Sequence, residues 1–224
     1  MKLTYWSHAC FLLETSSHRL VIDPFLSGNP KAEIRPGDVN CDFVLVTHGH
    51  NDHVGDAVEI AKANEATIVA NYETASFCGK QGASVHPMHI GGAFDFPFGR
   101  LKLTIAHHGS GLPDGGYGGQ AAGLLITAED KRIYIAGDTA LFSDMQLYKD
   151  PQVDLLILPI GDNFTMGPDD ALQAVRWISP RHCVPCHYNT WPPIEQDASA
   201  WAEQVKTETS AEPVVLEPGG KIVL

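Results

Sequence analysis

The segment HGHNDH, His48–His53, places three histidines and one aspartate within six residues, directly after an apolar run. Imidazole nitrogens together with a carboxylate suit Zn²⁺, Fe or Mn²⁺, whereas Ca²⁺ and Mg²⁺ prefer oxygen ligands. On a tight loop, His48 and His50 can point the same way, while Asp52 and His53 point to an adjacent position. The alternative is a polar turn with hydrogen-bonded histidines, but so dense a cluster favours a metal site.

The elements that must position this cluster follow from the apolar pattern, in which each half of the chain runs from several strands to strand–helix units. Such an order predicts a layered α/β fold with two sheets packed face to face, helices outside and chemistry in the loops at the strand C-ends. Strands are predicted at residues 2–6, 9–15, 18–22, 43–47, 67–70, 101–106, 121–127, 131–137, 153–160, 182–187 and 220–224. Helices are predicted at residues 55–64, 168–178 and 197–207.

Size and charge narrow the class of protein. A length of 224 residues predicts a single domain spanning residues 1–224. The net charge is −12, and 15 Lys and Arg against 27 Asp and Glu leave little material for the basic face that nucleic-acid binding needs. No segment approaches the roughly 20 apolar residues of a membrane span, and the N-terminal stretch has no signal-peptide or lipidation pattern. We expect a cytoplasmic protein that acts on a small molecule, with no nucleic-acid or membrane partner, and leave assembly into a homo-oligomer open.

The stretch CVPCH, Cys183–His187, has several interpretations. It matches the pattern that attaches c-type haem, and it could also be a redox dithiol, half of a zinc site or one ligand histidine beside two incidental cysteines. Haem attachment belongs to exported proteins, and this N-terminus shows no export signal. An odd total of five cysteines predicts buried free thiols rather than a disulfide framework.

The sequence T-H-x-H-x-D-H at Thr47–His53 resembles the signature of the metallo-β-lactamase superfamily. The resemblance implies a four-layer αβ/βα sandwich, in which two facing mixed sheets carry helices outside. It also implies a third histidine, a bridging aspartate and a final histidine, each at the end of a later strand. The candidates, in chain order, are His108 in AHHGSG, Asp138 in IAGDTALF and His187 in CVPCHYN.

Two details of this ligand set stay open. Either His107 or His108 could be the third histidine, since neighbours on an extended segment face opposite ways. Related sequences resemble A-x-H-G-S with the ligand directly before glycine, which favours His108. The residue before the final histidine is usually apolar in related sequences, whereas this chain has Cys186 there. The resemblance assigns His187 to a metal and thereby weakens the haem interpretation.

Three further stretches, WSHACFLLET, PIGDNFTMGPDDA and HYNTWP, resemble the metal-dependent hydrolases close to the ascorbate-6-phosphate lactonase branch, and the match spans nearly the whole chain. The resemblance implies that His8 and Asn189 are catalytic residues near the metals, acting on substrate or supporting the ligands. Asp162 is a candidate of the same kind. For His8, a hydrogen-bonded histidine on the first strand is an equal alternative. The resemblance does not specify a substrate.

The implied activity is hydrolysis of a small ester, lactone or phosphoester by a hydroxide held between two divalent ions, with zinc favoured and manganese or iron open. If only one ion binds, Asp52 becomes free to act as a general base. The implied ligands are His48, His50 and His108 for the first ion and Asp52, His53 and His187 for the second, with Asp138 bridging.

Other functions share parts of this pattern. A mononuclear iron sulfur-dioxygenase would use the same scaffold and leave the second set of ligands vacant. A tRNA-processing nuclease is disfavoured by the acidic charge, and a flavo-diiron oxidase by His50, where that class carries glutamate. A metal-binding module without turnover is the alternative from outside the enzymes.

Overall fold

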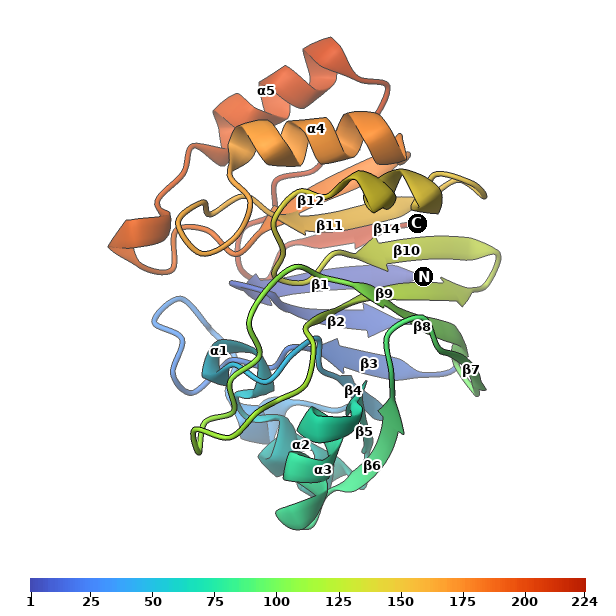
Figure 1. Ribbon diagram of the computed structural model, residues 1–224, viewed down its shortest axis with the longest axis vertical. Coiled ribbons are helices and arrows are strands. Elements are labelled where there is room, and N and C mark those ends of the chain that lie inside the picture. The colour runs from blue at the N-terminus through green and yellow to red at the C-terminus, as the bar shows by residue number, and fades with distance from the viewer.

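The computed structural model describes residues 1–224 and contains two seven-stranded mixed sheets that face each other (Figure 1). The first sheet has the order β14 (Lys221–Val223), β1 (Lys2–Ser7), β2 (Cys10–Glu14), β3 (Arg19–Ile22), β4 (Phe43–Leu45), β5 (Thr67–Asn71) and β6 (Ser84–Met88). The second has the order β13 (Glu212–Pro213), β12 (His182–Cys186), β11 (Leu155–Pro159), β10 (Lys131–Ile135), β9 (Ala122–Ala128), β8 (Gly99–Ile105) and β7 (Ala93–Phe96).

Helices cover the outer face of each sheet. The helices α2 (Ala57–Asn64) and α3 (Tyr72–Lys80) pack on the first sheet, and α4 (Pro168–Ile178) and α5 (Ala198–Glu208) pack on the second. The short helix α1 (Asn51–Val54) and three 3₁₀ helices, Pro36–Asp38, Ser143–Tyr148 and Pro192–Ile194, lie in the connections. This arrangement confirms the predicted α/β sandwich of two facing sheets with helices outside. None of the helices has the length and apolar character needed to span a bilayer.

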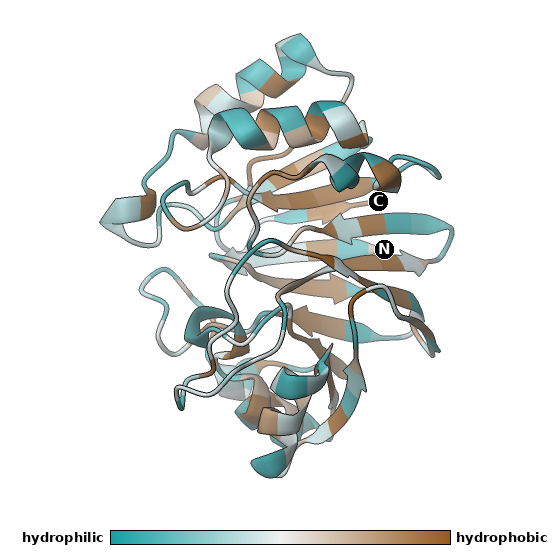
Figure 2. Cartoon of the chain, viewed as in Figure 1, coloured by the Kyte–Doolittle hydropathy of each residue, from teal (hydrophilic) through white to brown (hydrophobic).

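The core explains why several strands are apolar at every position. In β11, Leu155 and Ile157 point into the layer between the sheets, whereas Leu156 and Leu158 point toward α4 and α5. A strand that is buried on both faces needs apolar side chains on both, so the sequence shows a continuous run instead of an alternation. Figure 2 shows this apolar band along the central strands of both sheets.

The direction of the strands determines where the loops gather. In the first sheet β3, β4 and β5 are parallel, and β1 runs the same way because two antiparallel pairings separate it from β3. In the second sheet β8 and β10 run the same way for the same reason, and β12 runs with them because β10, β11 and β12 are parallel. The residues that follow these strands therefore meet at one edge of the sandwich.

Several elements lie outside the sequence predictions. Helix α3 and strands β6, β7 and β13 were not predicted, and α1 is a single extra turn inside the histidine-rich loop. Helix α3 buries only small side chains, Thr74, Ala75 and Cys78, so its apolar face is weak in the sequence. The Asn71 side chain caps it by accepting the Thr74 N–H at 2.9 Å.

Candidate metal centre

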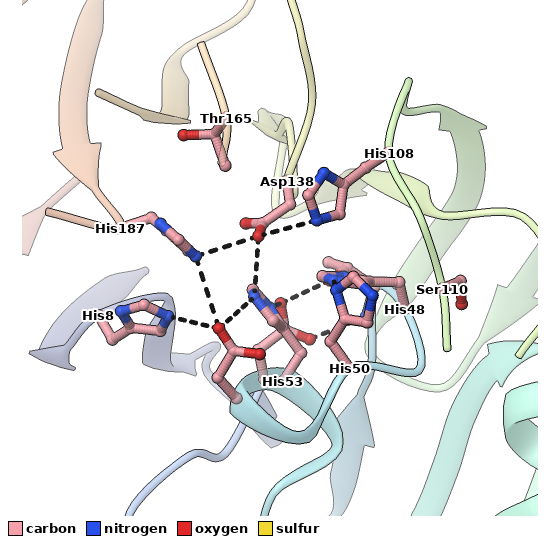
Figure 3. A network of polar contacts seen from close by, with 12 residues as sticks. His8, His48, His50, His53, His108, Ser110, Asp138, Thr165 and His187 are labelled. Atoms are coloured by element: carbon pink, nitrogen blue, oxygen red, sulfur yellow. Dashed lines mark hydrogen bonds and ion pairs between the residues drawn. The ribbon is translucent and has the colours of Figure 1, made fainter. Parts of the chain in front are cut away.

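Every predicted ligand lies at the same edge of the sandwich, beyond the carboxyl end of a strand (Figure 3). The first sheet contributes the histidine-rich loop after β4, and the second contributes the residues after β8, β10 and β12. Three of these side chains come from distant parts of the sequence: His108 after β8, Asp138 after β10 and His187 after β12. The site therefore lies between the two sheets, with ligands from each.

Asp138 is the central carboxylate of the cluster. Its Oδ2 lies 3.2 Å from His53 Nε2, 3.1 Å from His187 Nε2 and 3.6 Å from His108 Nε2. Its side chain is almost entirely buried. One carboxylate oxygen therefore faces ring nitrogens from three separate loops.

Asp52 has a similar position on the other side of the cluster. Its Oδ2 lies 3.1 Å from His8 Nε2, 3.7 Å from His187 Nε2 and 3.8 Å from His53 Nε2. Its side chain keeps 27 % exposure, in contrast to the buried histidines around it. Asp52 is thus the more exposed of the two central carboxylates, and both line a cavity beside the cluster.

The donor atoms fit metal ions. Those of His48, His50 and His108 lie within 4.8 Å of one another, and so do those of His8, Asp52, His53 and His187. A tetrahedral ion with ligand distances of about 2.1 Å places its ligand atoms about 3.4 Å apart, and the carboxylate–imidazole distances above lie around this value. A further group joins His48, His53 and Asp138, so all seven predicted ligands fall in clusters that could hold a metal ion, and His8 lies among them.

Orphaned nitrogens give a second indication of a cation. His53 Nε2 and His187 Nε2 are buried and make no hydrogen bond of acceptable geometry, although carboxylate oxygens lie nearby. His48 Nε2 lies 3.0 Å from His50 Nδ1, so two ring nitrogens face each other. Buried polar atoms are nearly always paired, and nitrogens that bind a metal are a regular exception.

The pKa values of His187 and Asp138 are shifted in opposite directions, each by the charge of its neighbours. Burial opposes the charged imidazolium of His187, but Asp138 outweighs it and raises the pKa of His187 to about 9. Burial likewise opposes ionisation of Asp138, but His187 and His53 hold the pKa of Asp138 well below its usual value. Without a metal, protons on the histidines balance the carboxylates. A divalent ion would displace those protons, so metal binding releases protons.

Asp23 is a functional residue that the sequence analysis missed. It follows β3 with a left-handed backbone (φ 43°) and is 1 % exposed. Its Oδ1 accepts the Thr47 N–H at 2.8 Å, and its Oδ2 accepts the Thr47 hydroxyl at 2.7 Å and contacts His53 Nδ1 at 2.8 Å. This contact fixes the His53 ring so that Nε2 faces the cluster. The available signal was an aspartate directly after a buried strand, the same context that identified Asp138.

The ambiguous pair is separated by the structure. His108 faces the cluster, with its ring 5.1 Å from those of His48 and His50. His107 is exposed and packs against the ring of Phe142 at 4.9 Å. Its backbone N–H donates to the Thr139 hydroxyl at 2.9 Å, which holds the segment in place. The geometry therefore favours His108 as the donor.

Cys186 is not among the clustered donors. Its side chain is part of the core between the sheets, and burial raises the pKa of its thiol well above the usual value. All five cysteines are free and buried, which confirms the expected absence of a disulfide framework. CVPCH is therefore a buried strand followed by a metal-facing histidine.

Two candidate residues, Asn189 and Asp162, do not line the cavity beside the donors. Asn189 is exposed, and its side chain bonds the backbone of Gln196 through both its amide and its carbonyl, at 3.1 and 2.7 Å. Asp162 is exposed and bonds the N–H of Asn163 at 2.9 Å. Both have left-handed backbones and shape turns. Asn and Asp tolerate this conformation and bond their own backbone, which explains their presence without a catalytic role.

Comparisons with known proteins agree with this fold and centre. Residues 18–188 match the model of the beta-lactamase superfamily domain. The chain is 53 % identical over 230 residues to a UPF0173 metal-dependent hydrolase of Bacillus cytotoxicus, covering all of both chains. It is 52 % identical over 211 residues to YtkL of Bacillus subtilis, a protein of the same designation, covering 92 % of this chain and 93 % of that one. Among solved structures, the metallo hydrolase Igni18 of Ignicoccus hospitalis superposes with a TM-score of 0.89 at 33 % identity, covering 99 % and 97 % of the two chains.

The sandwich with its cluster of histidines and aspartates defines a metal-dependent hydrolase of the metallo-β-lactamase class. Within that class, the chain belongs to the UPF0173 metal-dependent hydrolases of the beta-lactamase superfamily.

Proposed function

We propose that this chain hydrolyses a small ester, lactone or phosphoester at a centre of two divalent ions, with zinc as the ion that best suits the donor set. The observation that carries the proposal is the convergence of two groups of donor atoms on one cavity. When bound, the ions would lower the pKa of a water molecule and polarise the bond to be cleaved. Imidazole and carboxylate ligands suit Zn²⁺, and Mn²⁺ or Fe remains compatible with them.

The residues of the chain have distinct parts in this proposal. His48, His50 and His108 would hold one ion. Asp52, His53 and His187 would hold the other. Burial opposes ionisation of Asp52, but the neighbouring His187 and His8 rings keep the pKa of Asp52 well below its usual value. Asp52 therefore stays ionised at neutral pH, as a ligand must. If the second ion is absent, this carboxylate can take a proton from water as a general base.

We assign His8 the part of a positioning residue. Its side chain is fully buried and does not line the cavity, so it cannot touch a substrate there. Its Nε2 contacts Asp52 Oδ2 at 3.1 Å, and its Nδ1 contacts the Thr190 hydroxyl at 2.8 Å. Burial, followed by the nearby His187, lowers the pKa of His8 to about 4, so the ring is neutral and can donate from Nε2 while accepting at Nδ1. The Asp52 carboxylate only accepts, so it selects the tautomer with the proton on Nε2, and the Thr190 hydroxyl donates to Nδ1 and holds the ring in place.

Replacing Thr190 with valine is expected to lower the affinity for the second ion about tenfold, because partners that orient a ligand are worth about 10-fold to 100-fold in affinity. Competition with a chelator of known affinity measures this change without any substrate. Thr207→Val, on the exposed face of α5, is the matched control and should leave both affinities unchanged. Equal affinities in the two variants would remove the positioning role from His8.

Other functions are less well supported. A mononuclear iron sulfur-dioxygenase would have no use for a second group of donors, whereas here Asp52, His53 and His187 bring their donor atoms together. A tRNA-processing nuclease would need a basic surface, and the net charge is −12. A non-catalytic module would need no open cavity beside the donors. We accordingly propose a small molecule as the substrate and the cytoplasm as the location, in keeping with five free cysteines.

Metal analysis of protein purified without chelators is the decisive experiment, paired with a screen of ester, lactone, thioester and phosphodiester substrates. We expect two ions per chain, and hydrolysis that is lost with a chelator and restored by zinc. A single iron together with oxygen uptake would favour the dioxygenase. Two ions with no turnover of any substrate class would favour the metal-binding module.

A further inference from the structure

The cavity beside the donors is lined by candidate metal ligands on one side and by mostly apolar side chains on the rest. It measures about 520 Å³, which suits a small organic molecule. The donors Asp52, Asp138, His50, His108 and His187 form one side. Three aromatic rings and a proline form the rest, and one neutral amide is the sole polar group that is not a predicted ligand. These residues are Phe25, Phe164, Trp191, Pro193 and Asn51.

The aromatic walls are held in place by the same residues that hold the donors. The ring of Trp191 packs edge-on against His8 at 4.9 Å and lies 5.9 Å from Phe25. Phe25 is 5 % exposed and contacts His8 on another side at 5.7 Å. These two rings are therefore a preformed surface beside Asp52 and His187.

Phe164 belongs to a different segment and stands at the opening. It is 55 % exposed and lines the cavity, so part of its ring is available to a bound molecule. The turn that carries it is fixed by left-handed Asp162 and Asn163 and by the Thr165 N–H bonded to the Asp162 carbonyl at 3.1 Å. A rigid turn that displays an aromatic ring over the cavity is suited to binding an apolar group.

The charges of the cavity favour an uncharged ligand. No lysine or arginine lines it, and its only carboxylates are Asp52 and Asp138. Bound ions can accept one oxygen of the reacting group. A second anionic group, such as a phosphate on a sugar, would have to lie against Phe25, Phe164 or Trp191 without a countercharge, and an unpaired charge in an apolar setting is costly.

We propose that the substrate is an uncharged carboxylic ester or lactone whose non-reacting part is aromatic or aliphatic, held between Phe164 and Trp191. This proposal rests on the hydrolase function and selects carbonyl substrates without a second charge from the classes named above. In the reaction, the oxygen of water bonds to the carbonyl carbon and the bond from that carbon to the alcohol oxygen breaks. One proton of the water passes to the alcohol oxygen as it leaves, and the acid product carries the water oxygen and releases the other proton at neutral pH.

Two acetate esters that share the phenyl ring and the reacting group test the charge preference. Phenyl acetate is neutral, and 4-acetoxybenzoate is the same ester with a carboxylate on the ring. We expect kcat/KM to be at least tenfold higher for phenyl acetate, within the range by which a pocket discriminates on desolvation. Equal or faster turnover of 4-acetoxybenzoate, or better turnover of 4-nitrophenyl phosphate than of both esters, would overturn the proposal while leaving the hydrolase function intact.

Variants test the aromatic wall. Phe164→Ala is expected to raise KM for phenyl acetate about tenfold with kcat nearly unchanged, since one apolar contact in a pocket is worth about 10-fold to 200-fold. Phe94→Ala is the matched control, because Phe94 is 47 % exposed on β7 and lies outside the cavity. Phe164→Lys should shift the preference toward 4-acetoxybenzoate. If Phe164→Ala and Phe94→Ala gave the same KM for phenyl acetate, Phe164 would have no role in binding.

Binding gives a measurement that needs no turnover. Acetophenone has the shape of phenyl acetate but cannot be hydrolysed, and 4-acetylbenzoate is its charged counterpart. Ligand-observed NMR on the metal-loaded protein should show tighter binding of acetophenone, reduced by Phe164→Ala and unaffected by Phe94→Ala. If no ester is hydrolysed yet acetophenone binds in this way, the hydrolase function fails while the character of the pocket stands. Tighter binding of 4-acetylbenzoate would reject the pocket assignment.

Discussion

The His48→Ala protein is expected to lose the first metal ion and at least about 10³-fold in hydrolytic activity, the scale of losing the several kcal/mol that a metal ion supplies to charge stabilisation. His48 is fully buried, and it lies within ligand distance of donors in both groups, His50 and His108 in one and His53 and Asp138 in the other. No other side chain can substitute for it at that place. Metal content by mass spectrometry and kcat/KM on an ester substrate measure the effect.

Two further variants separate loss of the ion from loss of the fold. His108→Ala removes a donor that is 15 % exposed, so it disturbs packing less and should lose the same ion. His107→Ala changes the neighbouring residue, which packs on Phe142 outside the cavity, and should keep both metal and activity. Full activity in the metal-depleted His48→Ala protein would end the metal-dependent interpretation.

Gly161→Ala is expected to destabilise the protein by about 2 kcal/mol or more, because forced overpacking in a rigid interior typically costs about 1–3 kcal/mol. Gly161 follows β11, and an added Cβ would lie closer than 3.0 Å to the backbone carbonyl oxygen of His187. Backbone cannot rotate away as a side chain can. The chain would have to move the turn that presents His187, so the affinity for the second ion should fall together with stability.

Gly37→Ala is the control for the glycine experiment, since an added Cβ there meets nothing within 4 Å. Denaturant unfolding of the two proteins compares their stability, and chelator competition compares their affinity for metal. An unfolding midpoint of Gly161→Ala equal to that of Gly37→Ala would show that the loops after β11 and β12 are not in the close contact described above.

The metal ligands could be predicted from the sequence because each is a short-range signal: a histidine or aspartate directly after a buried strand. Asp23 carries the same signal, but it makes its bonds with a loop about two dozen residues away, and a search restricted to clusters passes over it. Its role depends on β3 lying beside β4, which is a tertiary fact. The resemblance supplied the order of the remaining ligands, and the parallel strands supply the physical reason for their convergence.

The direction of side chains in loops was harder to predict, because loops have no regular side-chain period like that of a helix or a strand. The stretch HYNTWP suggested Asn189, yet the side chain that reaches the cavity is Trp191, two positions later. The left-handed backbone of Asn189 turns its own side chain toward Gln196 instead. The loop after β11 shows the same pattern. Asp162 was the candidate there, yet Phe164 lines the cavity and Asp162 shapes the turn.

Because donors come from both sheets, bound ions would also cross-link the two sheets and so stabilise the fold. The loop after β4 and the residues after β8, β10 and β12 belong to opposite leaves of the sandwich, so each filled site ties the two leaves together across their open margin. An ion that binds only the assembled arrangement adds its binding free energy to that of folding. Removing the ions with a chelator should therefore lower the free energy of unfolding as well as abolish activity. The supply of metal in the cell would then influence the lifetime of the folded chain.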